Sequence, residues 1–117
     1  MAEFVKIPIA GLSTSQRKID REPDEITRLL RALRAAIVVL QTQRELGVAL
    51  VEKTMKLDRP AAEKLYPIYR EQFNPDLTVP ESVVEEWITV GTFRAKEKTT
   101  VKSQVVRDWS FAEQAKR

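Results

Sequence analysis

The chain has 117 residues, of which 43% are hydrophobic and 32% charged, so it is long enough for one folded domain with a modest core. Its formal net charge is only +3, from 20 Lys and Arg against 17 Asp and Glu interspersed along the chain, which argues against a nucleic-acid-binding surface. Neither cysteine nor histidine occurs, which excludes disulfides, thiolate metal sites, cysteine nucleophiles and histidine general bases.

The N-terminal segment, residues 1–15, reads as extended. Phe4, Val5, Ile7 and Ile9 favour a strand, and Pro8 restricts that strand to an edge because it cannot donate a ladder hydrogen bond. A short helix over residues 15–21 is expected to follow, with Ser13 or Ser15 as its cap.

Pro23 opens the clearest helix, because proline needs no hydrogen-bond donor at the first helical position. Asp24 and Glu25 follow in the first turn, where acids suit the positive end of the helix dipole. Apolar residues recur at three- and four-residue spacing, which predicts a long or bent helical region over residues 23–56. Gly47 predicts a bend near residues 43–47.

Three further segments complete the expected fold. A helix over residues 59–74 should start beside Pro60 and be kinked or divided at Pro67. A helix over residues 80–92 should end near Gly91, before a charged linker over residues 94–98, and residues 100–117 form a short helical or irregular tail. The sequence thus predicts one all-α domain, a bundle of four or five helices behind an extended N-terminal segment. The expected core comprises Leu30, Leu33, Ile37, Leu50, Leu65, Tyr69, Val84, Trp87 and Ile88.

The carboxylates offer no convincing acid–base pair. Glu85 with Glu86, and Glu52, Glu63, Glu71 and Glu81, occupy surface positions of the predicted helices, where solvated ion pairs are the simpler interpretation. No motif for calcium, phosphate or a serine nucleophile is complete, and the run of hydroxyl residues at 13–15 suits a helix cap better than a phosphate loop. We therefore expect no catalytic centre, no metal and no cofactor.

Two groups of basic residues are candidates for an anion or an acidic partner. One gathers at a helix junction, and the other is a ridge on the long helix; they comprise Lys53, Lys56, Arg59 and Lys64, and Arg28, Arg31 and Arg34. Solubility alone also accounts for such ridges. The spacing of Trp87 favours the core over a ligand pocket, and Trp109 is expected to be partly exposed.

Several segments, taken in order, resemble the C-terminal portion of solute-binding proteins of nitrate/sulfonate/taurine-type ABC importers, which are type II periplasmic-binding proteins. They are residues 4–15, 21–26, 29–33, 49–50, 55–58, 61–63, Tyr66, Tyr69, 74–80 and 105–111. The resemblance implies non-enzymatic binding of small organic or inorganic anions. Family members are two-lobed α/β proteins with the ligand in the cleft between lobes. This chain lacks most of both sheets, so no ligand-binding residue is carried over, and a truncated or free-standing piece is implied.

The competing hypothesis is a stand-alone helical module for protein interaction or dimerisation. In a family-like parent, residues 4–14 would be a sheet strand, and an unpaired apolar strand invites pairing with another chain. We therefore expect a homodimer, and two-fold symmetry is the commonest arrangement for one.

No segment reaches the roughly 18 apolar residues of a membrane span. A signal peptide is not recognisable, so the chain as it stands is expected in the cytoplasm, and outside it if cut from such a parent.

Overall fold

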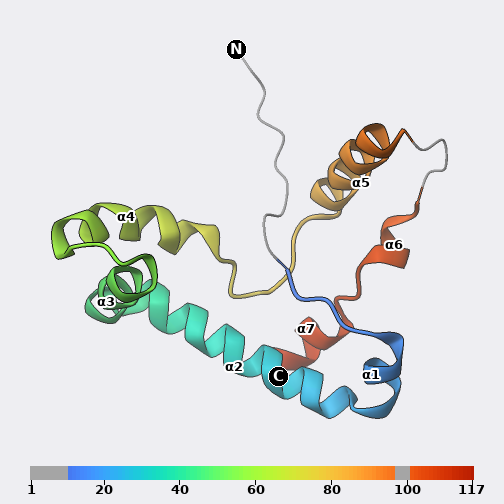
Figure 1. Cartoon of the computed structure of the whole chain (residues 1–117). Coiled ribbons are helices and arrows are strands. Elements are labelled where there is room, and N and C mark those ends of the chain that lie inside the picture. The colour runs from blue at the N-terminus through green and yellow to red at the C-terminus, as the bar shows by residue number, and fades with distance from the viewer. Residues whose placement is uncertain (1–10, 97–100) are drawn as a thin grey trace. The chain divides into compact units, whose positions relative to one another are not determined.

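The computed structural model describes residues 11–96 and 101–117, and the regular secondary structure in these ranges is helical (Figure 1). The prediction of an all-α fold is thereby confirmed for the described residues. Residues 11–15 belong to no helix or strand, and the rest of the expected extended segment lies outside the described residues. The helices are α1 (Gln16–Arg21), α2 (Pro23–Thr42), α3 (Arg44–Met55), α4 (Arg59–Gln72), α5 (Glu81–Ala95), α6 (Ser103–Val106) and α7 (Ser110–Ala115).

The chain groups into two compact units. The first unit comprises Met1–Pro23 and Thr78–Ser110, and it contains α1, α5 and α6. The second unit comprises Asp24–Leu77 and Phe111–Arg117, and it contains α2, α3, α4 and most of α7. Each unit has its own packing.

Local signals set where the helices begin. The side chain of Ser15 caps α1 by accepting a hydrogen bond from the backbone N–H of Lys18 at 3.2 Å. Asp58 caps α4 in the same way through the N–H of Ala61 at 2.9 Å. Both caps satisfy N–H groups that have no partner inside the helix. The start of α2 at Pro23 also lies where the sequence predicted it.

Two helix boundaries differ from the sequence-based expectation. Helix α4 continues through Pro67, so the expected division into two helices does not occur. Pro67 is exposed, whereas Ala62 and Tyr66 are buried. Helix α5 continues past Gly91 to Ala95 and ends at Lys96, whose φ of 55° supplies the left-handed C-cap. Part of the expected charged linker is therefore helical.

The core of the second unit lies between α3 and α4. Val48, Val51, Ala62 and Tyr66 are buried there, with the half-buried side chains of Leu40, Leu57, Leu65 and Tyr69 packed around them. Two expected core residues are on the surface instead, because Leu50 is 54% exposed and Trp87 47% exposed. The periodicity identified apolar residues on these helices but not which apolar side faces the core.

Hydrogen bonds to backbone carbonyls tie the end of α2 to α4. The Tyr66 hydroxyl donates to the carbonyl of Leu40 at 2.6 Å, and Gln41 Nε2 donates to the carbonyl of Phe73 at 2.7 Å. The chain then leaves helical geometry at Gln43, with φ −108° and ψ 85°, before α3 begins. This break lies within the bend predicted near residues 43–47.

The C-terminal helix α7 lies beside α2 in the second unit (Figure 1). Thr27, which is buried, donates its hydroxyl to Oε1 of Gln114 at 3.3 Å. Ala112 and Ala115 are also buried, and Lys116 forms an ion pair with Asp76 at 3.7 Å. Polar side-chain contacts thus link this last helix to α2 and to the turn after α4.

Gly47 permits a close approach of Tyr66 in the core. A Cβ atom built on Gly47 would overlap Cε2 of Tyr66 and lie 2.9 Å from its Cδ2. The Tyr66 ring cannot move away cheaply, because it is buried and its hydroxyl is hydrogen-bonded to Leu40. Glycine is therefore required at this position by the packing of α4.

We predict that Gly47→Ala lowers the free energy of unfolding by about 1–3 kcal/mol, the usual cost of overpacking a core. Urea unfolding followed by circular dichroism measures the change. Gly91→Ala is the matched control, because nothing lies within 4 Å of the added Cβ. Alanine should stabilise that exposed helical position by about 1 kcal/mol. Equal effects of the two substitutions would contradict the close approach of Tyr66.

Candidate functional site

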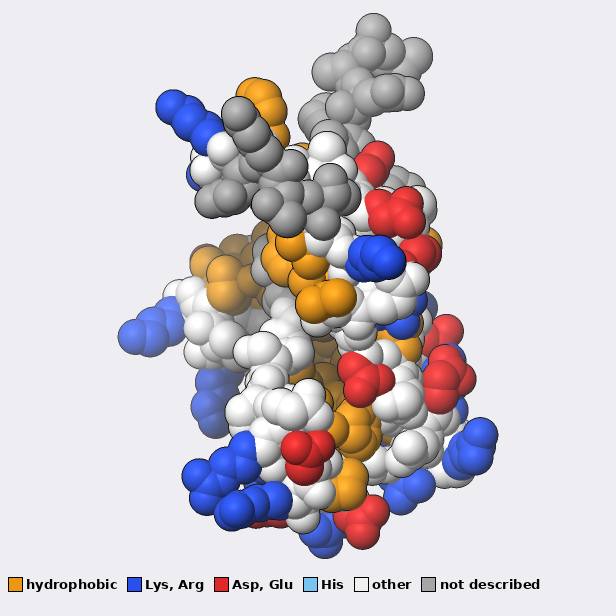
Figure 2. All heavy atoms as spheres, turned by 90° about the vertical axis from the view of Figure 1, so that its right-hand side faces the viewer, with side chains coloured by type: hydrophobic (Ala, Val, Ile, Leu, Met, Phe, Trp, Pro, Cys, Tyr) orange, Lys and Arg blue, Asp and Glu red, His pale blue; other side chains and the backbone are white. Residues whose placement is uncertain are grey.

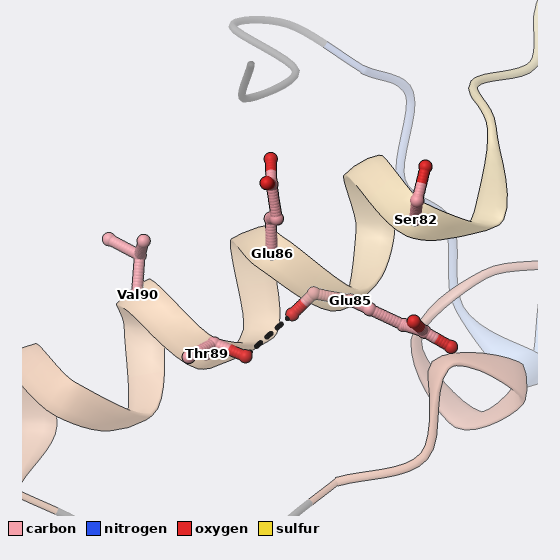
Figure 3. A pocket seen from close by; sticks show the side chains of 5 residues that line it. All are labelled: Ser82, Glu85, Glu86, Thr89 and Val90. Carbon is pink, nitrogen blue, oxygen red and sulfur yellow. Dashed lines mark hydrogen bonds between the residues drawn. The ribbon is translucent and has the colours of Figure 1, made fainter. Parts of the chain in front are cut away.

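A depression open to solvent lies along α5. The described residues that line it all come from this one helix, and they are Ser82, Glu85, Glu86, Thr89 and Val90 (Figure 3). Glu86 and Glu85 project in different directions, and Thr89 donates its hydroxyl to the backbone carbonyl of Glu85 at 2.9 Å. The two carboxylates do not face one another, so this depression does not form the acid–base pair that sequence analysis considered.

The other candidate carboxylates are dispersed. Glu63 and Glu71 are exposed on α4, and Glu52 is half-buried on α3. Within residues 11–96 and 101–117, no group of three or more Asp or Glu side chains is arranged to hold a metal ion. Glu63 already pairs with Arg59 at 3.1 Å.

Glu81 departs from its expected role as a solvated surface residue. The hydroxyl of Ser103 donates to Oε1 of Glu81, and Arg107 Nη2 donates to Oε2 at 2.8 Å. The guanidinium of Arg107 also lies over the indole ring of Trp109, 5.8 Å from its centroid. These four residues, which we call the Glu81 cluster, join the start of α5 to α6 and the segment after it. Sequence reasoning missed the cluster because its members are 22 and 26 residues apart along the chain.

Hydrogen bonding to the carboxylate sets the charge state of the Glu81 cluster. The hydrogen bond from Ser103 is the main cause that lowers the pKa of Glu81 below its ordinary value of 4.5, and Arg107 lowers it further. In the next segment the Ser110 hydroxyl and N–H, at 2.6 and 2.9 Å, lower the pKa of Asp108. Both carboxylates are stabilised as anions, so neither is suited to donate a proton near neutral pH.

The basic group at the α3–α4 junction does not form an open anion site. Arg59 binds Glu45 at 2.6 Å and Glu63 at 3.1 Å, and the hydrogen bond with Glu45 is the main cause that raises its pKa. Lys53, Lys56 and Lys64 are exposed around it. The strongest donor of this group is thus already paired with carboxylates.

The three arginines of the predicted basic ridge on α2 differ in their exposure to solvent. Arg28 is exposed, and Arg31 donates to the carbonyl of Gln114 at 3.5 Å. Arg34 is half-buried. Arg31 is therefore the one arginine of the ridge with a hydrogen bond to another helix, whereas the buried Nε of Arg34 has no hydrogen-bond partner among the described residues.

The remaining candidates from the sequence are the hydroxyl residues at 13–15 and the two tryptophans. Ser15 caps α1, whereas Ser13 and Thr14 are exposed. Trp109 is half-buried beneath Arg107, and Trp87 lies on the exposed side of α5. Trp87 thus exposes the large apolar surface that is typical of a binding face.

No family model matches this chain, and no curated protein or solved structure matches it either. The resemblance to importer solute-binding proteins therefore stays a prediction from sequence. Among the described helices, none combines the length and apolar character needed to cross a membrane.

We predict that acid releases the Glu81 cluster. The pKa of Glu81 is lowered in the folded state, so its stabilising contribution is complete above the ordinary value of 4.5 and is lost as the pH falls through the lower, folded pKa. The indole N–H resonance of Trp109 should report this transition by NMR, with a midpoint below 4.5. Glu81→Gln should abolish the transition, and Glu85→Gln, on the exposed side of α5, should retain it. A midpoint at or above the ordinary value would contradict the hydrogen-bonded carboxylate.

Proposed function

We propose that this protein is a non-enzymatic helical interaction module that functions as a homodimer. The observation that carries the proposal is that α3 and α5 each have a second apolar side that the described chain leaves exposed. On α3, Val48 and Val51 are buried, whereas Leu46 and Leu50 are 56% and 54% exposed. Leu46 and Leu50 are four residues apart, so they lie together on one side of the helix.

Helix α5 repeats the pattern in the other unit. Val84 is buried at 3% exposure, whereas Trp87 is 47% and Phe93 is 84% exposed. A tryptophan and a phenylalanine on one surface helix are unusual for a monomer and common at the centre of protein interfaces. In Figure 2, exposed hydrophobic side chains lie between side chains of both charges.

Burial of these exposed apolar side chains favours association. Fully burying one leucine or phenylalanine side chain stabilises a structure by about 1.5–3 kcal/mol. Several such side chains on one surface can offset the loss of translational and rotational freedom on binding, which costs about 4–15 kcal/mol. The sequence-based proposal of pairing through residues 4–14 is separate, because residues 4–10 lie outside the described residues and residues 11–14 form no strand.

We predict a solution mass of two chains in multi-angle light scattering across a broad concentration series. The dimer should persist in high salt, because burial of apolar surface is much less sensitive to ionic strength than pairing of exposed charges. A mass of one chain at every concentration would refute the homodimer. Dissociation by salt alone would indicate pairing through charges.

A second candidate is the anion binding implied by the resemblance to importer solute-binding proteins. A ligand that binds only the native state raises the melting temperature by mass action. Thermal unfolding with nitrate, sulfate or taurine distinguishes the two functions.

For an interaction module we predict no saturable increase in melting temperature with any of these ligands. Sulfate stabilises folded proteins in general by its exclusion from their surface, so only an increase that levels off with concentration reports a binding site. Chloride is the control for general salt effects on stability. A saturable increase with one anion, absent with chloride, would favour the solute-binding function instead.

A further inference from the structure

One side of α5 carries a stripe of side chains at three- and four-residue spacing. Residues with this spacing share one side of a helix. The stripe, which we call the α5 stripe, consists of Val83, Glu86, Trp87, Val90, Phe93 and Arg94. Figure 3 shows Glu86 and Val90 projecting from the same side of the helix. The stripe is distinct from the side of α5 on which Val84 is buried.

The α5 stripe is symmetric about Val90. Trp87 and Phe93 lie three residues before and after it, and Glu86 and Arg94 lie four residues before and after it. The large apolar residues thus occupy mirrored positions, and the mirrored charges are opposite. Glu86 and Arg94 are about 12 Å apart along the helix axis at 1.5 Å per residue, too far to pair with each other. Within the part of the chain that the structure describes, neither forms an ion pair.

We propose that a second copy of this chain packs its α5 antiparallel against the α5 stripe, with the two-fold axis passing at Val90. This inference rests on the proposed homodimer and assigns its interface. A two-fold axis there brings the two Val90 side chains together. The side chains on either side of the Val90 pair along the helix axes form two equivalent layers. In each layer, Glu86 and Trp87 of one copy face Phe93 and Arg94 of the other.

The charges on the α5 stripe favour a second copy of the chain as the partner and an antiparallel direction for the paired helices. In the antiparallel pair, each Glu86 meets Arg94 of the second copy, and the same guanidinium can lie against the Trp87 ring. A parallel pair would place Glu86 beside Glu86 and Arg94 beside Arg94, which is repulsive. A stripe whose mirrored positions carry opposite charges is complementary to itself, and this property favours a second copy over an unrelated partner.

Exposure agrees with this assignment. Phe93 is 84% exposed, and Glu86, Trp87 and Arg94 are exposed as well. Val83 and Val90 are half-buried, so they supply a seam between the larger side chains. Helices packed with small residues at the crossing approach to about 8–10 Å between axes, a distance at which facing valines touch.

The decisive experiment is a charge exchange measured by analytical ultracentrifugation. Glu86→Arg or Arg94→Glu alone should weaken the dimer about tenfold or more, because each leaves like charges facing at two symmetric places. The double variant Glu86→Arg/Arg94→Glu should restore the wild-type dissociation constant. Glu85→Arg, one residue away on α5 and outside the stripe, is the matched control and should leave it unchanged.

Cysteine cross-linking tests the position of the axis. The chain contains no cysteine. A single introduced cysteine can therefore form a disulfide only with the same residue of a second copy. Val90→Cys should form a disulfide-linked dimer under mild oxidation, because disulfides require Cα atoms within about 7 Å. Thr89→Cys should not, because it points off the stripe. Glu86→Cys should not either, because antiparallel packing separates the two copies along the helix, whereas parallel packing would join them.

The outcomes separate this inference from the proposed function. A dimer that is unaffected by the single charge substitutions and does not cross-link at position 90 would overturn the α5 pairing, while the homodimer would stand. A wild-type chain that is monomeric at every concentration would overturn both. Loss of the dimer in both single variants without rescue in the double variant would also overturn the pairing, because the antiparallel arrangement places Glu86 of each copy opposite Arg94 of the other.

Discussion

The structure of the second unit depends on the fit of Tyr66 over Gly47. The ring of this tyrosine fills the space that any larger residue on α3 would occupy, and its hydroxyl donates to the Leu40 carbonyl at the end of α2. One side chain of α4 thereby contacts both other long helices of the unit. Helices of 12 to 20 residues are marginal alone in water, so such contacts hold them in place.

The first unit uses a polar equivalent of this contact. Glu81 lies at the first position of α5 and accepts hydrogen bonds from Ser103 and Arg107, which come from later in the chain. The positive end of the α5 dipole favours the carboxylate, as do its two donors. Arg107 in turn lies against the Trp109 ring. A few directional interactions therefore take the place of the larger apolar core that a compact domain would have.

Small cores and exposed apolar sides are two consequences of the same sequence. Helices α3 and α5 are apolar on more than one side, so packing within each unit buries one side and leaves Leu46, Leu50, Trp87 and Phe93 at the surface. Carboxylates and guanidinium groups, by contrast, pair locally, as Arg59 does with Glu45 and Glu63. This division explains why the proposed function is association through apolar surface and not chemistry at a charged site.

The sequence by itself determined the fold class and most helix starts. The caps at Ser15 and Asp58 and the start at Pro23 act within one turn, so local residues suffice to predict them. Tertiary structure alone decided which apolar side of a helix is buried: Leu50 and Trp87 were expected inside but are exposed, whereas Tyr66, outside the expected core, is central. The Glu81 cluster was likewise invisible in sequence. Periodicity defines the sides of a helix, but only its neighbours in space determine which side meets water.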